Sequence, residues 1–184
     1  TVKADAAGLK PATEYTFLFR AKAADGDVIS PSGRTRTTSA DGTAPVKLGV
    51  VSCSNYQFGL FTAYTELSKE AGLDAIVHLG DYIYEYGTDG YGGDVAAQLG
   101  RPHDPPTEII SLSDYRRRHA QYKTDPGLQA AHAAAPWICT WDDHESANNP
   151  WVDGAQNHQS GTEGNWSARR AASIQAYYEW MPIR

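Results

Sequence analysis

Three short apolar runs, each followed by polar residues, constrain the fold of this chain more than any other feature. Residues 46–51 are apolar at most positions, as in a strand that is buried on both faces of a parallel sheet. Residues 58–71 follow with apolar residues at helical spacing up to Gly72, and residues 74–79 form the second run. Strand, helix and strand in this order predict a right-handed β-α-β unit. We therefore expect an α/β fold with a parallel or mixed sheet layered with helices.

The third apolar run and the helices before it extend this pattern. Residues 137–141 predict the third strand. Ser113 is the expected N-cap of a helix over residues 114–122, and Pro126 is the expected first residue of a helix that reaches residue 134.

Two further segments complete this part of the chain. Residues 87–106 are rich in glycine and proline and predict a long loop. Residues 167–181 predict a final helix, whose inward face we expect to hold Ala171, Ile174, Tyr178 and Met181.

The first 40 residues have a different, all-β pattern. Apolar side chains alternate along residues 13–22, which predicts one strand with Tyr15, Phe17, Phe19 and Ala21 on a single face. Residues 24–27 are typical of a turn, and residues 33–38 predict a second strand. The small polar residues 39–45 are the best boundary in the chain, with residues 41–45 as the linker.

Chemically active side chains follow each of the three apolar runs. Ser52-Cys53-Ser54 follows the first run, Gly80-Asp81-Tyr82-Ile83-Tyr84-Glu85 the second, and Asp142-Asp143-His144-Glu145 the third. Ligands of open α/β sheets bind at the carboxyl ends of the strands, so we expect these segments to meet. Carboxylates, a phenol, a thiol and an imidazole can together hold a pair of metal ions.

Each of these residues also has an ordinary structural explanation. Instead of binding a metal, Cys53 could be an inert buried cysteine, and Tyr84 could serve aromatic packing. His78 is expected in the core. The other histidines outside the motif and the arginine run are expected on the surface, namely His103, His119, His132, His158, Arg116, Arg117 and Arg118.

The charge of the chain excludes some partners. Its 184 residues carry a formal net charge of −6 at pH 7, whereas nucleic-acid backbones require a basic surface. We therefore expect no stable nucleic-acid binding. No apolar run approaches the ~18 residues that would cross a membrane. The two cysteines, Cys53 and Cys139, are too few for a disulfide framework.

Four sequence blocks, read together, resemble one family. They are "VVSCSNYQFGLFTAY", "VHLGDYIYEYG", "TWDDHESANN" and "SARRAASIQAYYEWMPIR", and they resemble successive blocks of the PhoD-like alkaline phosphatases, a branch of the metallophosphoesterases. The resemblance implies that residues 46–184 are the N-terminal half of a catalytic domain, which is a four-layer α/β/β/α fold in the intact family. Residues 1–40 resemble part of a fibronectin III-like β-sandwich.

The resemblance also implies a set of metal ligands. Asp81 corresponds to the carboxylate that bridges two metal sites, and Cys53 and Tyr84 to the thiolate and phenolate that bind iron. Asp143 corresponds to a ligand of the second metal, with Asn148 or Asn149 as a further candidate. The implied cofactors are Fe³⁺ and Ca²⁺, with another pair of divalent cations as the alternative.

The implied activity is hydrolysis of phosphate mono- or diesters by a metal-activated water. His144 corresponds to the catalytic histidine beside the phosphoryl group, and the partners are small phosphate-ester substrates. The resemblance implies a secreted, periplasmic or cell-surface protein. Because no leader pattern opens the chain at Thr1, we expect that a signal peptide was removed or that these residues never began the gene product.

Two other interpretations stay open. The first is a non-catalytic cation-binding or structural module, which the length favours because members of the family continue past Arg184 with further motifs. The chain therefore resembles an internal fragment, whose activity on its own is a separate question from the activity of its parent. The second is an unrelated zinc hydrolase, which the lack of His-x-His or His-x-x-x-His spacing disfavours.

Overall fold

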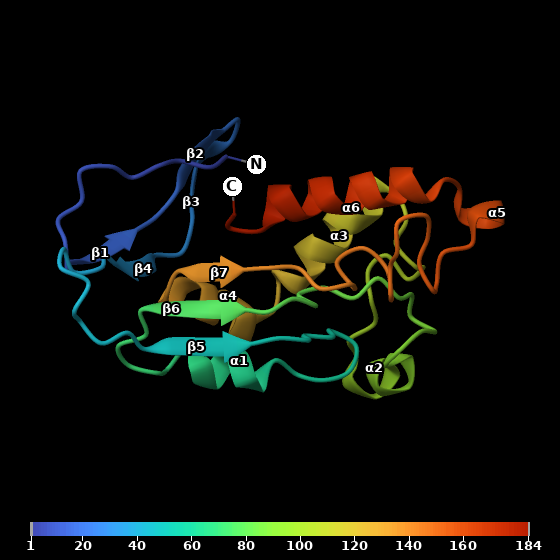
Figure 1. Ribbon diagram of the computed structural model, residues 1–184, viewed down its shortest axis with the longest axis horizontal. Coiled ribbons are helices and arrows are strands. Elements are labelled where there is room, and N and C mark those ends of the chain that lie inside the picture. Colours follow the sequence, from blue (N-terminus) through green and yellow to red (C-terminus); the bar gives the residue numbers. More distant parts are fainter. Residues whose placement is uncertain (1, 184) are drawn as a thin grey trace.

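A computed structural model describes residues 2–183 (Figure 1). Its centre is a parallel sheet with the order β5-β6-β7, formed by β5 (Leu48–Val51), β6 (Ala75–His78) and β7 (Trp137–Cys139). These strands lie within the three apolar runs, which confirms the predicted α/β fold. In Figure 1 their arrowheads point toward the same side of the molecule, so their carboxyl ends share one edge.

Two helices cover one face of this sheet. They are α1 (Thr62–Leu67) and α4 (Pro126–Ala134). A Cβ atom at Gly49 would lie 2.7 Å from the end of the Leu67 side chain, so the glycine leaves room for this α1 side chain against β5. On the same face, the Trp137 indole donates a 3.2 Å hydrogen bond to the carbonyl of Ala131 in α4. The core therefore lies between these two helices and the sheet.

The other face of the sheet carries apolar side chains in contact with solvent. Leu48, Val50 and Ile138 are 49%, 60% and 59% exposed. The expectation that residues 46–51 would be buried on both faces is therefore wrong for the described residues. An apolar sequence pattern predicts a strand, but it does not show which part of the protein packs on each face of that strand.

The remaining helices differ from the predictions in their ends. Helix α1 is shorter than the predicted 58–71 and ends well before Gly72. Helix α3 (Leu112–Tyr122) begins at Ser111 instead of Ser113, because Ser111 and Asp114 form a reciprocal capping box. Helix α4 begins at Pro126 as predicted. The predicted loop over residues 87–106 contains α2 (Gly93–Leu99), and α5 (Ser160–Glu163) is a single turn.

Helix α6 (Trp166–Trp180) packs against α3, but its inward face was predicted wrongly. Ala171, Ile174 and Tyr178 are exposed, whereas Met181 is buried as expected. The buried face comprises Trp166, Arg169, Ser173, Ala176 and Tyr177. Apolar spacing misplaced this face because a buried arginine and a buried serine occupy two of its positions.

Four short strands form two small antiparallel sheets in the N-terminal segment. Strand β1 (Glu14–Phe17) pairs with β4 (Gly33–Arg36), and β2 (Arg20–Ala23) pairs with β3 (Gly26–Ile29). The single strand expected over residues 13–22 is therefore wrong, because the chain changes sheets at Leu18–Phe19. The turn predicted at residues 24–27 is confirmed at Ala24 and Asp25, whereas Gly26 and Asp27 already belong to β3. The division of the chain at residues 41–45 stays a prediction.

Several polar side chains expected on the surface are buried. His103 and His119 are 2% and 0% exposed, and burial lowers the pKa of each to about 3, so both are neutral. Arg118 is also 0% exposed, whereas Arg116 and Arg117 lie on the surface. His78 is in the core as expected.

The buried Arg118 guanidinium fixes the segment that carries the site. It donates hydrogen bonds to five backbone carbonyls, those of Tyr84, Tyr86, Asp104, Pro105 and Thr107. A guanidinium has five N–H donors in a rigid plane, which suits this task. The backbone around Tyr84 is thus fixed by a side chain of α3.

No helix within residues 2–183 is long and apolar enough to cross a membrane.

Candidate metal site

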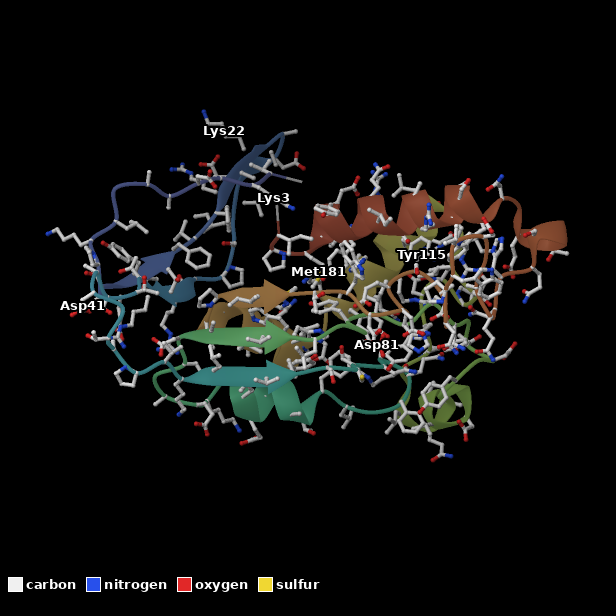
Figure 2. All side chains as sticks on the ribbon, in the orientation of Figure 1. Lys3, Lys22, Asp41, Asp81, Tyr115 and Met181 are labelled. Carbon is white, nitrogen blue, oxygen red and sulfur yellow. The ribbon has the colours of Figure 1, made fainter. Side chains whose placement is uncertain are left out.

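The three predicted segments meet at the carboxyl ends of the strands. The amide of Cys53 donates to the carbonyl of Gly80 at 3.1 Å, and the amide of Ser54 donates to the carbonyl of Asp81 at 2.9 Å. Figure 2 shows Asp81 just beyond the arrowheads of β5 and β6. Backbone hydrogen bonds therefore place the first two segments beside each other.

The turns after the strands have an unusual backbone conformation. Cys53 and Asp81 have φ angles of 58° and 55°, a left-handed region that few non-glycine residues adopt. Gly80, with a φ of 110°, lies so close to the next segment that a Cβ atom would be 2.4 Å from the amide nitrogen of Asp142. Such conformations cost on the order of 1–3 kcal/mol and concentrate at functional sites.

Three potential ligands lie together at this edge. One side-chain atom each from Asp81, Asp143 and His144 lies within 4.8 Å of the other two. The Tyr84 hydroxyl donates to Oδ2 of Asp81 at 3.2 Å, and the His144 amide donates to Oδ1 at 3.3 Å. The structure therefore brings four of the predicted site residues into one group.

The electrostatics of this group favour a bound cation. Burial, together with the negative charge of Asp143, raises the pKa of Asp81 above its usual value. Burial and the charge of Asp81 also raise the pKa of Tyr84 far above that of a free tyrosine. Without a cation, the ionised forms of Asp81 and Tyr84 are therefore disfavoured. A cation bound between them would lower both pKa values and favour the ionised forms. The donor set of carboxylates, phenol and imidazole fits a metal ion.

The other two predicted ligands lie at the margins of this group. Cys53 is exposed and lines a cavity of about 400 Å³, whose wall also includes Tyr84 and Tyr91. Its free, accessible thiol is therefore not the inert buried cysteine considered from the sequence. The Asn148 side chain donates to Oε1 of Gln156 at 2.8 Å. The neighbouring Asn149 donates its amide to Oδ2 of Asp143 at 2.7 Å.

Two residues of this site were missed in the sequence. Glu85 is fully buried, and its Oε2 lies 2.8 Å from Nδ1 of His144. Its Oε1 accepts hydrogen bonds from the Asn148 amide at 2.6 Å and from the Asn157 side chain at 2.7 Å. Glu85 lies within a motif that was recognised, but nothing in the sequence linked it to Asn157, which is 72 residues away.

The His144 imidazole is held from two sides. Its ring stacks on Tyr84 with 4.2 Å between the ring centroids. Burial opposes protonation, but the hydrogen bond and charge of Glu85, assisted by Asp143 and Asp81, raise the pKa of His144. Nε2 lies 4.0 Å from Oδ1 of Asp143. The geometry therefore leaves Nε2 as the nitrogen that can act within the group.

Comparison with known proteins identifies the family. The family model described as "PhoD-like phosphatase" matches residues 48–184. The chain belongs to the PhoD-like phosphatase family. It is 44% identical over its whole length to alkaline phosphatase D of Bacillus subtilis (strain 168), of which it covers 30%. A solved structure described as "Structure of PhoD" matches 96% of the chain with a TM-score of 0.81 and 44% identity.

The matched part is a limited share of these PhoD-like relatives. The chain spans about a third of the length of each, 30% of the curated protein and 32% of the solved chain. The predicted family and fold are confirmed, whereas the individual ligand assignments stay predictions.

Removing metal from this PhoD-like protein should destabilise it more at neutral pH than at mildly acidic pH. Without a cation, burial raises the pKa of Glu145 to about 7 and also raises that of Asp81. For carboxyls with a raised pKa in the folded state, stability is highest below the ordinary carboxyl pKa and falls as pH rises through the raised value. A bound cation should prevent this loss of stability, because it favours the ionised carboxylates in the folded state.

The measurement is Tm with and without a chelator, from about pH 5 to about pH 8. We expect the difference between the two Tm values to widen as pH rises. A constant difference across this range would mean that no cation offsets these carboxylates.

Proposed function

We propose that the protein to which this chain belongs is a metal-dependent hydrolase of phosphate mono- or diesters. The observation that carries the proposal is the convergence of Asp81, Asp143 and His144 within 4.8 Å beyond the carboxyl ends of two neighbouring parallel strands, β6 and β7. Membership of the PhoD-like family and the name of the Bacillus subtilis relative support the same activity.

The proposed ligand roles follow the chemistry of the donors. Asp81 is proposed to bind both cations, and the position of its two oxygens beside groups of two different segments supports this role. Cys53 and Tyr84 supply the thiolate and phenolate that suit Fe³⁺, and Asp143 and Asn148 supply oxygens that suit Ca²⁺. When bound, the two cations would activate a water and neutralise charge on the phosphoryl oxygens.

The residues of the chain then bind and protonate the substrate. His144 presents Nε2 beside the carboxylate group and is proposed to protonate the leaving oxygen of the ester. Tyr84 stacks on the His144 ring and covers that face of it. Small phosphate esters are the proposed substrates, and the proposed location is the periplasm, the cell surface or the medium.

The iron assignment can be tested by its colour. In the full-length protein we expect Tyr84→Phe to abolish the visible absorption of a tyrosinate–iron bond. Cys53→Ser should weaken iron binding far more than calcium binding, because a soft sulfur is lost while an oxygen remains. The measurement is a visible spectrum together with quantitative metal analysis of each variant.

Two results would contradict this assignment. An absorption band that persists in Tyr84→Phe excludes Tyr84 as the ligand. An equal loss of both metals in Cys53→Ser indicates that the whole site has collapsed.

A cation-binding module without turnover is the second candidate. It is favoured by one observation, that two of the three groups in the cluster, Asp81 and Asp143, are carboxylates, whose oxygens are good ligands for Ca²⁺. Iron with a visible band supports the hydrolase, and calcium alone supports the module. Zinc alone would support the unrelated zinc hydrolase.

A further inference from the structure

The Glu85 carboxylate is a buried group whose hydrogen bonds can orient a catalytic side chain. It is 0% exposed, and an unpaired buried carboxylate would be costly. Its two oxygens have separate partners, since Oε1 accepts from two donors of the 148–157 segment and Oε2 faces Nδ1 of His144 at 2.8 Å. Glu85 therefore joins the site to a segment that is distant in sequence.

The partners of Glu85 are themselves fixed. The Arg118 guanidinium holds the carbonyls of Tyr84 and Tyr86 on either side of Glu85. On the opposite side, the buried Arg169 donates to the carbonyl of Asn157 at 3.4 Å and to Oε1 of Glu108 at 2.7 Å. Two buried arginines from different helices thus hold the two segments that meet at Glu85.

This arrangement has a direct consequence for the His144 ring. A carboxylate only accepts hydrogen bonds, so the nitrogen that faces Glu85 must carry the proton. Nδ1 is therefore an N–H in every state in which Glu85 is ionised. Nε2 is left to face Asp143, where it is either a lone pair or a second N–H.

We propose that Glu85 is a positioning residue that holds His144 in one orientation and one tautomer, with Nε2 directed to the reacting groups. This inference rests on the proposed function for its effect on rate, because it assumes that His144 acts on the ester. The orientation itself does not depend on that assumption. Neither the family assignment nor the metal ligands require Glu85 to have this role.

The decisive variant is Glu85→Gln in the full-length protein. The Asn148 amide and the Asn157 side chain both donate to the same oxygen of Glu85, so the glutamine oxygen must stay there. The glutamine NH₂ then faces Nδ1 of His144, which has to become an acceptor. We expect the proton of neutral His144 to move from Nδ1 to Nε2.

The tautomer is read by ¹⁵N NMR of metal-free protein labelled at histidine, because protonated and bare ring nitrogens have well-separated shifts. A His144→Gln variant assigns the signal. The wild type should show the proton on Nδ1 and Glu85→Gln should show it on Nε2. A proton that stays on Nδ1 in Glu85→Gln overturns the proposal.

The kinetic measurement compares an alkyl phosphate with an aryl phosphate. Loss of a group that orients a ligating or catalytic histidine typically costs about 10–100-fold. We expect Glu85→Gln to lower kcat for the alkyl ester by about that factor and to affect the aryl ester less, since an aryl leaving group needs little protonation. An equal loss for both esters would mean that Glu85 is merely structural.

Glu145→Gln is the matched control. Glu145 is also buried, but its carboxylate accepts from the backbone amides of Tyr82 at 2.6 Å and Asp142 at 2.9 Å and does not hold His144. It should change the rates of both esters by the same factor and leave the His144 tautomer as in the wild type. A tautomer change in this control would overturn a specific role for Glu85.

A milder variant covers the case in which Glu85→Gln does not fold. Asn157→Ala removes one of the two donors to Oε1 and keeps the Asn148 amide. This variant should lower kcat for the alkyl phosphate by a smaller factor than Glu85→Gln does and leave kcat for the aryl phosphate nearly unchanged. An equal decrease for both esters would count against the proposal. If the wild type hydrolyses no ester but the tautomer changes as expected, the proposed function fails and the orienting role stands.

Discussion

Replacing His144 with alanine in the full-length protein should lower kcat by about 10²–10⁴-fold while the bound metal stays near its wild-type amount. The reason lies in the hydrogen bonds of the ring. Nδ1 is committed to Glu85, so His144 has a single nitrogen to offer, and the anionic oxygens for cation binding belong to Asp81 and Asp143. Loss of the imidazole therefore removes a proton donor but leaves those carboxylates in place.

The measurement pairs metal content with rate on two classes of ester. The decrease should be smaller for aryl phosphates, whose leaving groups need little protonation. Metal lost in parallel with activity would make His144 a ligand instead of an acid. If neither metal nor activity is lost, the interpretation of the 142–145 motif as catalytic is wrong, and the cation-binding module becomes the better account.

Asp81→Asn should remove metal and activity together. An amide has no charge to neutralise two cations, so several kcal/mol of electrostatic stabilisation is lost, and kcat/KM should fall by about 10³-fold or more. The fold should persist, because the asparagine oxygen can still accept from the His144 amide and its NH₂ group can donate to the Tyr84 hydroxyl oxygen. The measurement is metal analysis alongside kcat/KM.

Asp142→Asn is the matched control for this substitution. Asp142 is exposed and does not belong to the cluster formed by Asp81, Asp143 and His144. It should keep its metal and most of its activity. If Asp81→Asn retains both metals, Asp81 does not bridge them, and the ligand set has to be reassigned.

The position of the site could be predicted because parallel strands share an edge. Cys53, Asp81 and His144 each follow a separate apolar run, and parallel pairing brings all three run ends together without knowledge of any side-chain contact. The same logic gave the strands themselves within a few residues. Local patterns therefore determine which residues approach the site.

The contacts within the site could not be predicted in this way. Glu85 reaches Asn157 across 72 residues of sequence, and the loop between residues 148 and 158 has no periodicity that would fix its path. Helix α6 shows the same limit, because its buried face contains Arg169, which pairs with Glu108 from a distant loop. From the sequence alone, an arginine of a buried ion pair cannot be distinguished from a surface arginine, because its partner is not known.

The Arg118 hydrogen bonds also bear on how natural variation should be distributed along α3. Three consecutive arginines look interchangeable, yet only Arg118 serves five carbonyls, whereas Arg116 pairs with Glu179 and Arg117 with Asp104 at the surface. Lysine can replace a surface arginine at little cost, but a single ammonium cannot reach carbonyls spread around a plane. Over evolutionary time, drift at positions 116 and 117 is thus compatible with an intact active site, while drift at 118 is not.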